Sequence, residues 1–239
     1  MNRGTALLVG GSSQIGMAVL IELLGPPPRR VVLAGRPSEE LWENAEKLRD
    51  LGYHVTTTQY DAAFQADEIE GMLEHVVADN QLGLAVVAVG SMAGKSFAEG
   101  LVVNGLAVAA LVEILVRRMS AAGSGQLVLL SSAAAARPRT AIAAYSLGKQ
   151  LADSTAVLLA PQAAAAGVRI LVVRPGFVAT RMTDGLTRPP LSSTAAQVAQ
   201  RVAQTLPGQS VVVWVPKPMG LVVWLLRRLP SRLLPETLR

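Results

Sequence analysis

Leu7-Leu8-Val9-Gly10-Gly11-Ser12-Ser13-Gln14-Ile15-Gly16 is the stretch of this 239-residue chain that best predicts its fold. It passes from a short apolar run, typical of a buried strand, through a glycine-rich turn into a helical pattern. Glycines at such a turn let the backbone approach a pyrophosphate, which then lies at the N-terminus of the helix, and the two serines add hydroxyl donors. A tight turn without any ligand has the same local pattern, so the rest of the chain must decide between the two.

Short apolar runs alternate with longer helical patterns along the chain. The expected strands are Ala6–Val9, Arg30–Ala34, His54–Thr58, Leu84–Val89, Gln126–Leu130, Arg169–Val173 and Ser210–Trp214. The expected helices are Gln14–Leu24, Ser38–Leu51, Ala66–Asp79, Leu101–Ala121, Ala143–Ala166 and Thr194–Thr205. This alternation predicts right-handed βαβ units, and hence a doubly wound α/β fold with a seven-stranded parallel sheet and helices on both faces. We expect one domain over residues 1–239, with an apolar helical tail at 216–239.

Composition narrows the class of protein. Hydrophobic residues make up 51% and charged residues 16% of the chain, which excludes a disordered protein. The absence of cysteine excludes disulfides and thiolate chemistry and fits a reducing compartment. No signal-peptide pattern is present, and the apolar run from Leu221 to Leu226 is far shorter than a membrane span, so we expect a cytoplasmic protein. The net charge is +5, but the arginines are scattered, and no nucleic-acid partner is expected.

Three polar side chains in the second half of the chain have one joint chemistry. Tyr145 and Lys149 are four residues apart, which places them on one face of a helix, and Ser132 follows a buried strand thirteen residues upstream. A neighbouring ammonium group favours phenolate, so we expect the pKa of Tyr145 to lie below its ordinary value of about 10. Tyr145 is then a candidate proton donor to a carbonyl oxygen, or acceptor from an alcohol. A solvated surface pair is the alternative for Tyr145 and Lys149, but the flanking residues are apolar.

The residues that follow the second and third strands bear on the choice of nucleotide. Arg36 stands where an acidic residue would hold a ribose 2′-hydroxyl, and an arginine there accommodates a 2′-phosphate instead. NADP(H) is therefore favoured over NAD(H), although Arg36 stacking on the adenine or capping the next helix is also compatible. Asp61 comes where an adenine edge would arrive, and a plain turn aspartate is the alternative.

Two further polar residues are site candidates. Asn104 is placed to hold a water between Lys149 and solvent, or simply to satisfy a backbone group within its helix. Thr180, in the loop after the sixth strand, is placed to bond a nicotinamide carboxamide, and an ordinary turn is the alternative. His54 and His75 have no partner at a metal-ligand spacing, so no metal site is predicted. The chain also lacks the Gly-x-Ser-x-Gly elbow of many hydrolases.

Together these residues resemble the short-chain dehydrogenase/reductase superfamily, with its Rossmann-like fold, over about nine-tenths of the chain. The resemblance implies that Tyr145 is the acid/base and that Lys149 lowers its pKa and holds the nicotinamide ribose. It also implies that Ser132 steadies the substrate oxygen and that Asn104 anchors a proton-relay water. The implied cofactor contacts are Gly10, Ser12, Ser13, Gln14, Ile15, Gly16, Arg36, Asp61, Ala62, Gly90, Tyr145, Lys149, Pro175, Val178 and Thr180. Dimers or tetramers built on the two long expected helices, Leu101–Ala121 and Ala143–Ala166, are implied as well.

The chain departs from the family pattern at three places. Gln14 replaces the usual middle glycine, which is expected to narrow the approach of the backbone to phosphate. Val87-Ala-Val-Gly90 replaces the usual Asn-Asn-Ala-Gly, so two amides that would brace the sheet are missing. The segment from Gly90 to Asn104 is short by roughly two helical turns, which puts the alignment of Asn104 in question.

Several stretches are similar to one subgroup of the superfamily, the actinobacterial decaprenylphosphoryl-2-keto-pentose reductases. They are Gly10–Gly16, Val87–Gly90, Arg174–Gly176 with Thr180–Met182, and Trp214–Pro216 followed by Leu225–Pro230. The similarity implies a ketosugar on a polyprenyl phosphate as the substrate. The tail from Met219 to Leu229, with Trp224, Arg227 and Arg228, fits a lipid channel or peripheral membrane contact, and equally a helix packed on the sheet or on another subunit.

The sequence thus predicts an NAD(P)H-dependent oxidoreductase that transfers hydride between nicotinamide and a carbonyl or alcohol carbon. The lipid-linked ketosugar is one substrate hypothesis; a small hydrophobic ketone or a polyketide-type intermediate is the other. A sensor or scaffold that binds NADP(H) without turnover is the alternative of another class, and the complete Ser-Tyr-Lys group argues against it.

Overall fold

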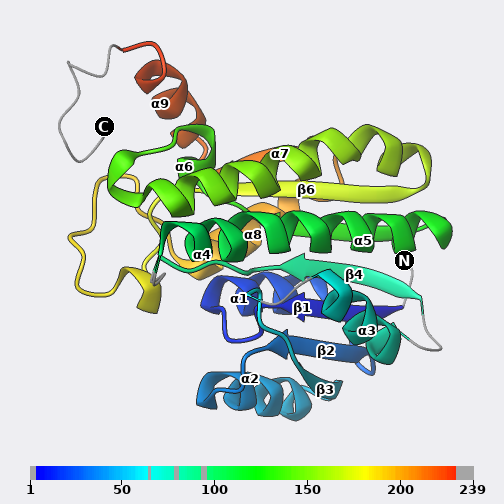
Figure 1. The fold of residues 1–239 in the computed structure, drawn as a ribbon. Helices are drawn as coiled ribbons and strands as arrows, with labels where there is room; N and C mark the ends of the chain where they lie inside the picture. The colour runs from blue at the N-terminus through cyan, green and yellow to red at the C-terminus, as the bar shows by residue number, and fades with distance from the viewer. Residues whose placement is uncertain (1–3, 64–65, 78–80, 93–95, 230–239) are drawn as a thin grey trace.

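The computed structural model describes residues 4–63, 66–77, 81–92 and 96–229, and Figure 1 traces the chain through them. Seven strands form one parallel sheet in the order β3-β2-β1-β4-β5-β6-β7. Their bounds are β1 Thr5–Val9, β2 Arg30–Gly35, β3 His54–Gln59, β4 Leu82–Val87, β5 Gly125–Leu130, β6 Val168–Pro175 and β7 Val212–Val215. The predicted fold class is confirmed: the order reverses between β1 and β4, so the chain winds outward from the centre in both directions.

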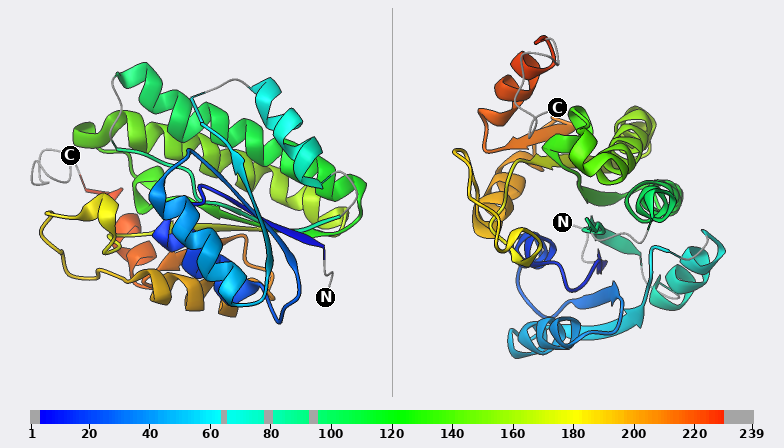
Figure 2. Two further views of the ribbon diagram at one scale, coloured as in Figure 1. Left: turned by 90° about the horizontal axis from the view of Figure 1, so that it is seen from below. Right: turned by 60° about the vertical axis from the view of Figure 1, so that its left-hand side comes forward.

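Helices cover both faces of this sheet (Figure 2). They are α1 Gln14–Leu23, α2 Glu39–Asp50, α3 Ala66–Val77, α4 Phe97–Leu101, α5 Ala107–Ala121, α6 Ala133–Ala136, α7 Ala143–Ala165, α8 Ala195–Thr205 and α9 Met219–Leu226. Three short turns complete the described elements: the π-helical η1 Val102–Leu106 and the 3-10 turns η2 Thr140–Ile142 and η3 Arg181–Thr183.

The core is two apolar layers, one on each face of the sheet. Alternate residues of each strand divide between them: Leu7 and Val9 of β1 pack with α3, α5 and α7, and Ala6 and Leu8 pack with α1, α2 and α8. Because both faces are covered, the central strands are apolar throughout, which is why they were recognisable as short unbroken runs.

The chain differs from the expected elements mainly at their ends. β4 lies two residues earlier than the predicted Leu84–Val89, because after Val87 only the Ala88 N–H still pairs, donating to the Val9 carbonyl at 2.7 Å. The helix predicted over Leu101–Ala121 begins at Phe97 and contains the π-helical turn. In the tail, the helical part that the structure describes is α9, and residues 230–239 lie outside the described ranges.

Among the described residues, one helical stretch, Phe97–Ala121, is long and apolar enough to cross a membrane, with a mean hydropathy of 1.9 over its most apolar window. Of that window, 56% is buried inside the protein. Burial against the sheet accounts for the apolar character of this helix.

Candidate active site

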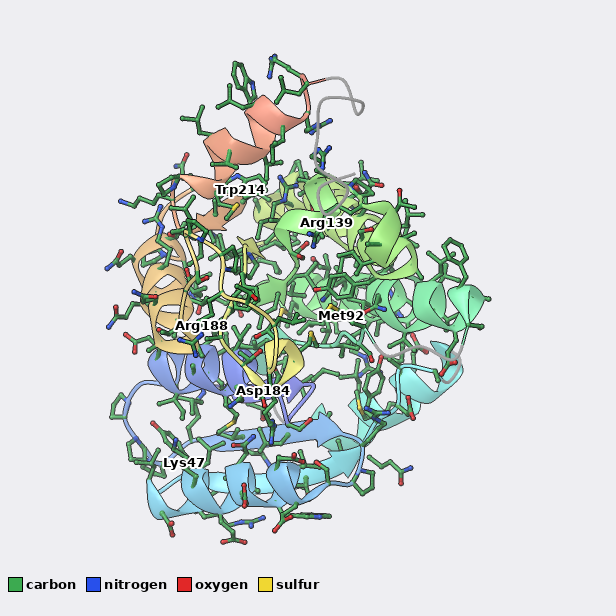
Figure 3. All side chains as sticks on the ribbon, turned by 90° about the vertical axis from the view of Figure 1, so that its left-hand side faces the viewer. Lys47, Met92, Arg139, Asp184, Arg188 and Trp214 are labelled. Atoms are coloured by element: carbon green, nitrogen blue, oxygen red, sulfur yellow. The ribbon has the colours of Figure 1, made fainter. Side chains whose placement is uncertain are left out.

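A cleft of about 350 Å³ opens at the carboxyl edge of the sheet, where ligands bind in doubly wound folds. Figure 3 looks onto this edge of the sheet. In that view Met92 and Arg139 lie to the right, and Asp184 and Arg188 lie to the left. The predicted cofactor residues that line the cleft are Gly10, Ser12, Ser13, Gln14, Ile15, Arg36, Asp61, Ala62, Gly90 and Thr180. Those that do not line it are Gly16, Pro175, Val178, Tyr145 and Lys149.

The turn from β1 into α1 has the geometry of a phosphate loop. Gly10 has φ +91°, which L side chains rarely adopt, and a Cβ there would lie 2.7 Å from the Ala88 carbonyl oxygen. Ser13 caps α1 by accepting the Gly16 N–H at 3.1 Å. The amides of Gln14 and Ile15 in the first turn have no intrahelical acceptor, and both residues line the cleft. This end of α1 is therefore suited to an anion.

Gly16 has a packing role instead of a contact with the cleft. A Cβ at Gly16 would lie 2.7 Å from the Ala88 Cβ and 2.9 Å from the Leu8 Cδ1. Glycine at this position lets α1 pack closely against β1 and β4, which fixes where the first turn of α1 meets the cleft.

Gln14, which stands where the family pattern has a glycine, makes a long-range side-chain contact. Gln14 is exposed, and its Oε1 accepts the Arg181 N–H at 2.8 Å. The residue that replaces a glycine therefore links the phosphate loop to the segment after β6.

Arg36 and Asp61 stand at the far end of the cleft, after β2 and β3. Arg36 is exposed. Ser38, and not Arg36, caps α2, its Oγ accepting the Leu41 N–H at 3.3 Å. The Asp61 Oδ1 accepts the Ala63 N–H at 3.0 Å, so Asp61 makes the turn contact that was its alternative interpretation while also lining the cleft.

Ser132 caps α6, its Oγ accepting the Ala134 N–H at 3.1 Å, and Tyr145 lies in the first turn of α7. Burial has the dominant effect on Tyr145: it raises the pKa of Tyr145 above its ordinary value, against the lowering effects of the Ser132 hydroxyl and of the Arg139 charge. The expectation that the pKa of Tyr145 lies below its ordinary value is therefore wrong for this structure, because desolvation of the phenolate outweighs the nearby positive charge.

Lys149 is fully inside the protein, one helical turn from Tyr145. Its Nζ donates to the Val89 carbonyl at 2.7 Å and to the Leu130 carbonyl at 2.8 Å, and it lies 6.0 Å from the centre of the Tyr145 ring. Burial lowers the pKa of Lys149 to about 8, and the carboxylate of Asp153 opposes this shift. The ammonium group thus joins the ends of β4 and β5 beneath the tyrosine.

Asn104 lies beside Lys149 despite the short segment before it. Its Oδ1 accepts the Ser91 N–H at 2.8 Å, and its Nδ2 donates to the Ser91 and Gly100 carbonyls at 2.9 and 2.8 Å. A Cβ at Gly90 would lie 3.1 Å from the Lys149 Nζ and 3.4 Å from the Asn104 Oδ1. Gly90 also lines the cleft, so it joins the cleft to the residues around Tyr145.

The π-helical turn η1 holds Asn104 in this position. A Cβ at Gly105 would lie 2.9 Å from the Gly148 Cα, so the backbones of η1 and α7 touch. The wide turn directs Asn104 into the protein, where it is 1% exposed, and π-type turns often occur at functional sites.

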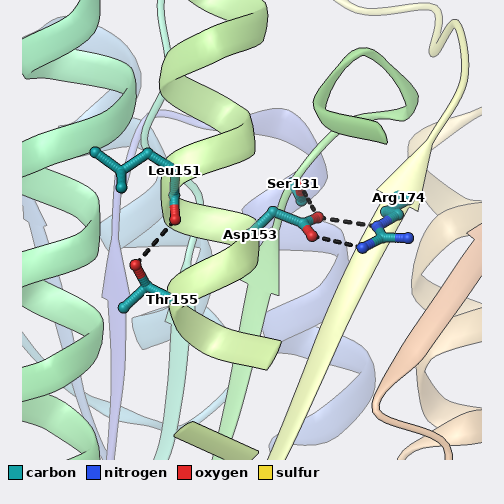
Figure 4. A network of polar contacts seen from close by, with 5 residues as sticks. All are labelled: Ser131, Leu151, Asp153, Thr155 and Arg174. Carbon is teal, nitrogen blue, oxygen red and sulfur yellow. Dashed lines mark hydrogen bonds and ion pairs between the residues drawn. The ribbon is translucent and has the colours of Figure 1, made fainter. Parts of the chain in front are cut away.

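One helical turn after Lys149, Asp153 belongs to a polar network that the sequence reasoning missed, and Figure 4 shows this network. The Asp153 carboxylate accepts two bonds from Arg174, at 2.6 and 3.0 Å, and the Ser131 hydroxyl donates to it at 2.5 Å. Asp153 follows Lys149 by four residues and is the one acidic residue of α7, so the signal available in the sequence was a single acid on a helix whose other charge is Lys149.

The loop after β6 supplies the last predicted contacts. Pro175 ends β6 and is buried, and Val178 is 4% exposed and forms a bridge with Ser193. Thr180 lines the cleft and begins η3, donating its N–H to the Thr183 Oγ1 at 3.0 Å. Arg181 and Met182 also line the cleft, although the sequence reasoning did not select them. In the part of the chain that the structure describes, no group of three potential metal ligands occurs.

Comparisons with known proteins agree with this geometry. The family model described as short chain dehydrogenase matches residues 4–190. An uncharacterized oxidoreductase of Mycobacterium tuberculosis, Rv2073c, is 34% identical over 242 residues, covering 96% of each chain. This chain belongs to the short-chain dehydrogenase family. It is an oxidoreductase of that type, as the sequence predicted.

Two further members show how widely the family pattern extends. An oxidoreductase of Streptomyces coelicolor, from the region 5′ of mprA, is 34% identical, covering 95% of this chain and 93% of its own. A short chain dehydrogenase of Burkholderia cenocepacia, solved in complex with NADP, has a TM-score of 0.77 at 18% identity and covers 98% of this chain and 100% of its own. The likeness to the solved structure shows the short-chain dehydrogenase fold.

Proposed function

We propose that this short-chain dehydrogenase uses NADPH to reduce a carbonyl group, with Tyr145 as the proton donor. One observation carries the proposal: Gly90 joins a nucleotide-type cleft to the buried group around Tyr145 and Lys149. A binding protein without turnover has no use for a tyrosine, a serine and a buried lysine held together at this edge.

The donor set of the cleft fits a dinucleotide. The Gly10 turn and the first amides of α1 suit a pyrophosphate, and Arg36 supplies a cation after β2. Bound there, the nicotinamide supplies the hydride. The Arg36 position favours NADPH over NADH, and the relative from Burkholderia cenocepacia was solved with NADP.

Tyr145 and the side chains around it donate the proton, orient the carbonyl oxygen and stabilise the charge that remains. A raised pKa keeps Tyr145 protonated at neutral pH, as a donor to a carbonyl oxygen requires. Ser132, whose hydroxyl acts on the pKa of Tyr145, orients that oxygen. Lys149 keeps a positive charge below about pH 8 and favours the phenolate left after proton transfer. Asn104, beside Lys149, anchors the water through which the proton is replaced.

Tyr145→Phe tests this assignment, with Tyr53→Phe as the matched control. Tyr53 bonds the Gly25 carbonyl and does not line the cleft. We expect Tyr145→Phe to lose nearly all carbonyl reduction while its NADPH affinity, measured by fluorescence titration, stays close to that of the wild type. Turnover near that of Tyr53→Phe would refute the proposed role of Tyr145.

The proposed substrate is a ketosugar carried on a polyprenyl phosphate. Support comes from α9, which stands at the carboxyl side of the sheet beside α6 (Figure 1). Its Leu221, Trp224 and Leu225 side chains are half or more exposed, and Arg227 and Arg228 follow them. Met219 at the start of α9 packs on Gly176, where the loop after β6 begins, so an apolar chain along α9 would lead to the site.

Two measurements test the substrate. NADPH consumption with a polyprenyl-phosphate 2-ketopentose is expected to exceed that with small hydrophobic or polyketide-like ketones at equal concentration. Flotation with anionic liposomes is expected to carry the wild type and to leave a Trp224→Ser/Leu225→Ser variant behind. If the enzyme reduces a small ketone faster and the wild type does not float with liposomes, the substrate hypothesis changes from the lipid-linked ketosugar to that ketone.

We propose that the chain is a homo-oligomer assembled through α5 and α7. An apolar stripe on α7, made by Leu147, Leu151 and Leu158, is exposed, and the Leu158 side chain is 79% accessible. Exposed apolar stripes of this kind are typical of subunit contacts. Light scattering is expected to give a dimer or tetramer, and Leu158→Glu is expected to shift it toward the monomer.

A further inference from the structure

Arg181 ties the segment after β6 to the phosphate loop. Its N–H donates to the Gln14 Oε1 at 2.8 Å, and its Nη2 donates to the Ser12 carbonyl at 2.8 Å. These contacts join residues more than 160 positions apart in the chain. They place a guanidinium group at the wall of the nucleotide cleft, which Arg181, Ser12 and Gln14 all line.

The other side of the same guanidinium faces α2. The Arg181 Nη1 lies 2.7 Å from the Oε1 of Glu40, in the first turn of α2. The group thus stands between the phosphate loop and the start of α2. In a doubly wound dinucleotide fold these are the elements that receive the pyrophosphate and the 2′ position of the adenosine ribose.

We propose that Arg181 is a phosphate-binding residue of the nucleotide cleft and that Glu40 is the internal counter-ion that a cofactor phosphate displaces. This inference rests on the proposed NADP(H) binding. A guanidinium has five N–H donors and binds phosphate through paired hydrogen bonds, whereas the contacts to Ser12 and Glu40 use one donor on each of two nitrogens.

The exchange of Glu40 for a phosphate is favourable because the existing ion pair is weak. The Arg181 and Glu40 side chains are 50% and 40% exposed, so water and salt screen their attraction. A phosphate group carries more charge and more acceptor oxygens than a carboxylate. Glu40 therefore holds the arginine in place without competing strongly for it.

This arrangement also gives Gln14 a role. A glycine at position 14 would leave the Arg181 backbone without the acceptor at 2.8 Å that fixes it against the loop. Gln14 then positions the arginine for phosphate, in place of the closer backbone approach that a glycine permits. The effects of substitutions at Gln14 and Arg181 on nucleotide affinity are therefore expected to be non-additive.

Dissociation constants for NADPH and NADH, measured by fluorescence titration, test the proposal. Arg181→Gln is compared with Arg188→Gln, which removes the same charge from an exposed residue of the same loop that does not line the cleft. We expect Arg181→Gln to weaken binding about tenfold or more, from the worth of a charged hydrogen bond, and Arg188→Gln to change it little. If Arg181→Gln weakens the binding of both nucleotides, the pyrophosphate is the group that Arg181 contacts. If it weakens the binding of NADPH alone, that group is the 2′-phosphate.

Two more variants complete the experiment. Glu40→Gln is expected to tighten NADPH binding, because it removes the competing anion, and Gln14→Gly is expected to weaken it in the wild type but not in Arg181→Gln. Equal constants for Arg181→Gln and Arg188→Gln, or weaker binding by Glu40→Gln, would overturn the inference while leaving the proposed function intact. A wild type that binds neither nucleotide would overturn both.

Discussion

Asp153 and Arg174 form a paired contact between α7 and β6: the Asp153 Oδ1 lies 2.6 Å from the Arg174 Nη2, and the Oδ2 lies 3.0 Å from the Nε. The aspartate side chain is 4% exposed and the arginine 20%. The arginine also lies over the Trp214 ring of β7, 5.2 Å from its centre. Since Ser131 bonds the same carboxylate and precedes Ser132, this pair sets the helix that carries Tyr145 against the strands that end at the site.

Removing the carboxylate is expected to destabilise the protein. Asp153→Asn leaves a mostly buried guanidinium without its counter-charge, and we expect the free energy of unfolding to fall by about 3 kcal/mol. Glu46→Gln is the matched control, because the Glu46–Arg49 pair is 68% and 41% exposed and is expected to contribute about 0.5 kcal/mol or less. Urea unfolding of both variants measures the two changes. Equal losses of unfolding free energy in Asp153→Asn and Glu46→Gln would contradict the expectation.

Lys149 is expected to make stability depend on pH in the alkaline range. Its pKa is about 8 in the folded protein and 10.5 as a free side chain, so between these values the unfolded chain holds a proton that the folded chain has released. Stability therefore rises with pH in this window, by at most about 1.4 kcal/mol per pH unit. Above about pH 10, ionisation of Tyr145 in the unfolded chain opposes the rise, because its folded pKa is raised.

Lys149→Met isolates this contribution. The variant is expected to lose the increase in unfolding free energy from about pH 8 to about pH 10, and Lys47→Met, at an exposed lysine of α2, is expected to keep it. The measurement is denaturant unfolding at a series of pH values. Parallel curves for the two variants would show that Lys149 is not the group responsible.

Gly148→Ala is expected to separate α7 from the π-helical turn. A Cβ at Gly148 would lie 2.7 Å from the Asn104 Cβ and 3.0 Å from the Gly105 nitrogen, and the backbone atoms cannot yield. We expect a loss of about 1–3 kcal/mol in stability and a fall in turnover, because Asn104 and Lys149 move apart. At Gly71 in α3 an added Cβ would meet nothing within 4 Å, so Gly71→Ala is expected to be neutral or stabilising by up to about 1 kcal/mol.

Tyr60→Phe is expected to leave stability unchanged or to raise it. The Tyr60 hydroxyl is buried and has no hydrogen-bond partner among the described residues, and burial raises the pKa of Tyr60. An unsatisfied buried hydroxyl costs about 1–3 kcal/mol, which its removal recovers. Tyr53→Phe, which loses a 2.6 Å bond to the Gly25 carbonyl, is expected to cost about 1 kcal/mol. Thermal unfolding of the two variants measures these changes in stability, which are expected to have opposite signs.

The sequence predicts those features of this protein that local patterns determine. The glycine-rich turn was recognisable because an apolar run precedes it and a helical run follows, and Gly10 has the positive φ that such a turn requires. The fold class followed from the alternation of strands and helices. The end of β4 was misplaced because Ala88 and Val89 continue the apolar run although only the Ala88 amide still pairs with a strand.

Features that depend on distant parts of the chain were not predictable. The pKa of Tyr145 was expected to fall because Lys149 is a neighbour on the helix, whereas its direction is decided by burial. The contact between Gln14 and Arg181 spans 167 positions, and no local pattern marks it. The Asp153–Arg174 pair is intermediate: a lone acid on α7 hints at a partner, but only the tertiary structure identifies it.

The π-helical turn at Val102–Leu106 changes which face of a continuous helix the following residues occupy. Each residue of an α-helix advances about 100° around the axis, so a turn that takes in one additional residue offsets the residues after it by about 100° from their positions in a regular helix. Val108, Leu111 and Leu115 can then face the sheet while Asn104 faces Lys149. In a regular helix of the same sequence, Asn104 would share one face with Val108, Leu111 and Leu115, which follow it by four, seven and eleven residues, and it would face the core instead of Lys149.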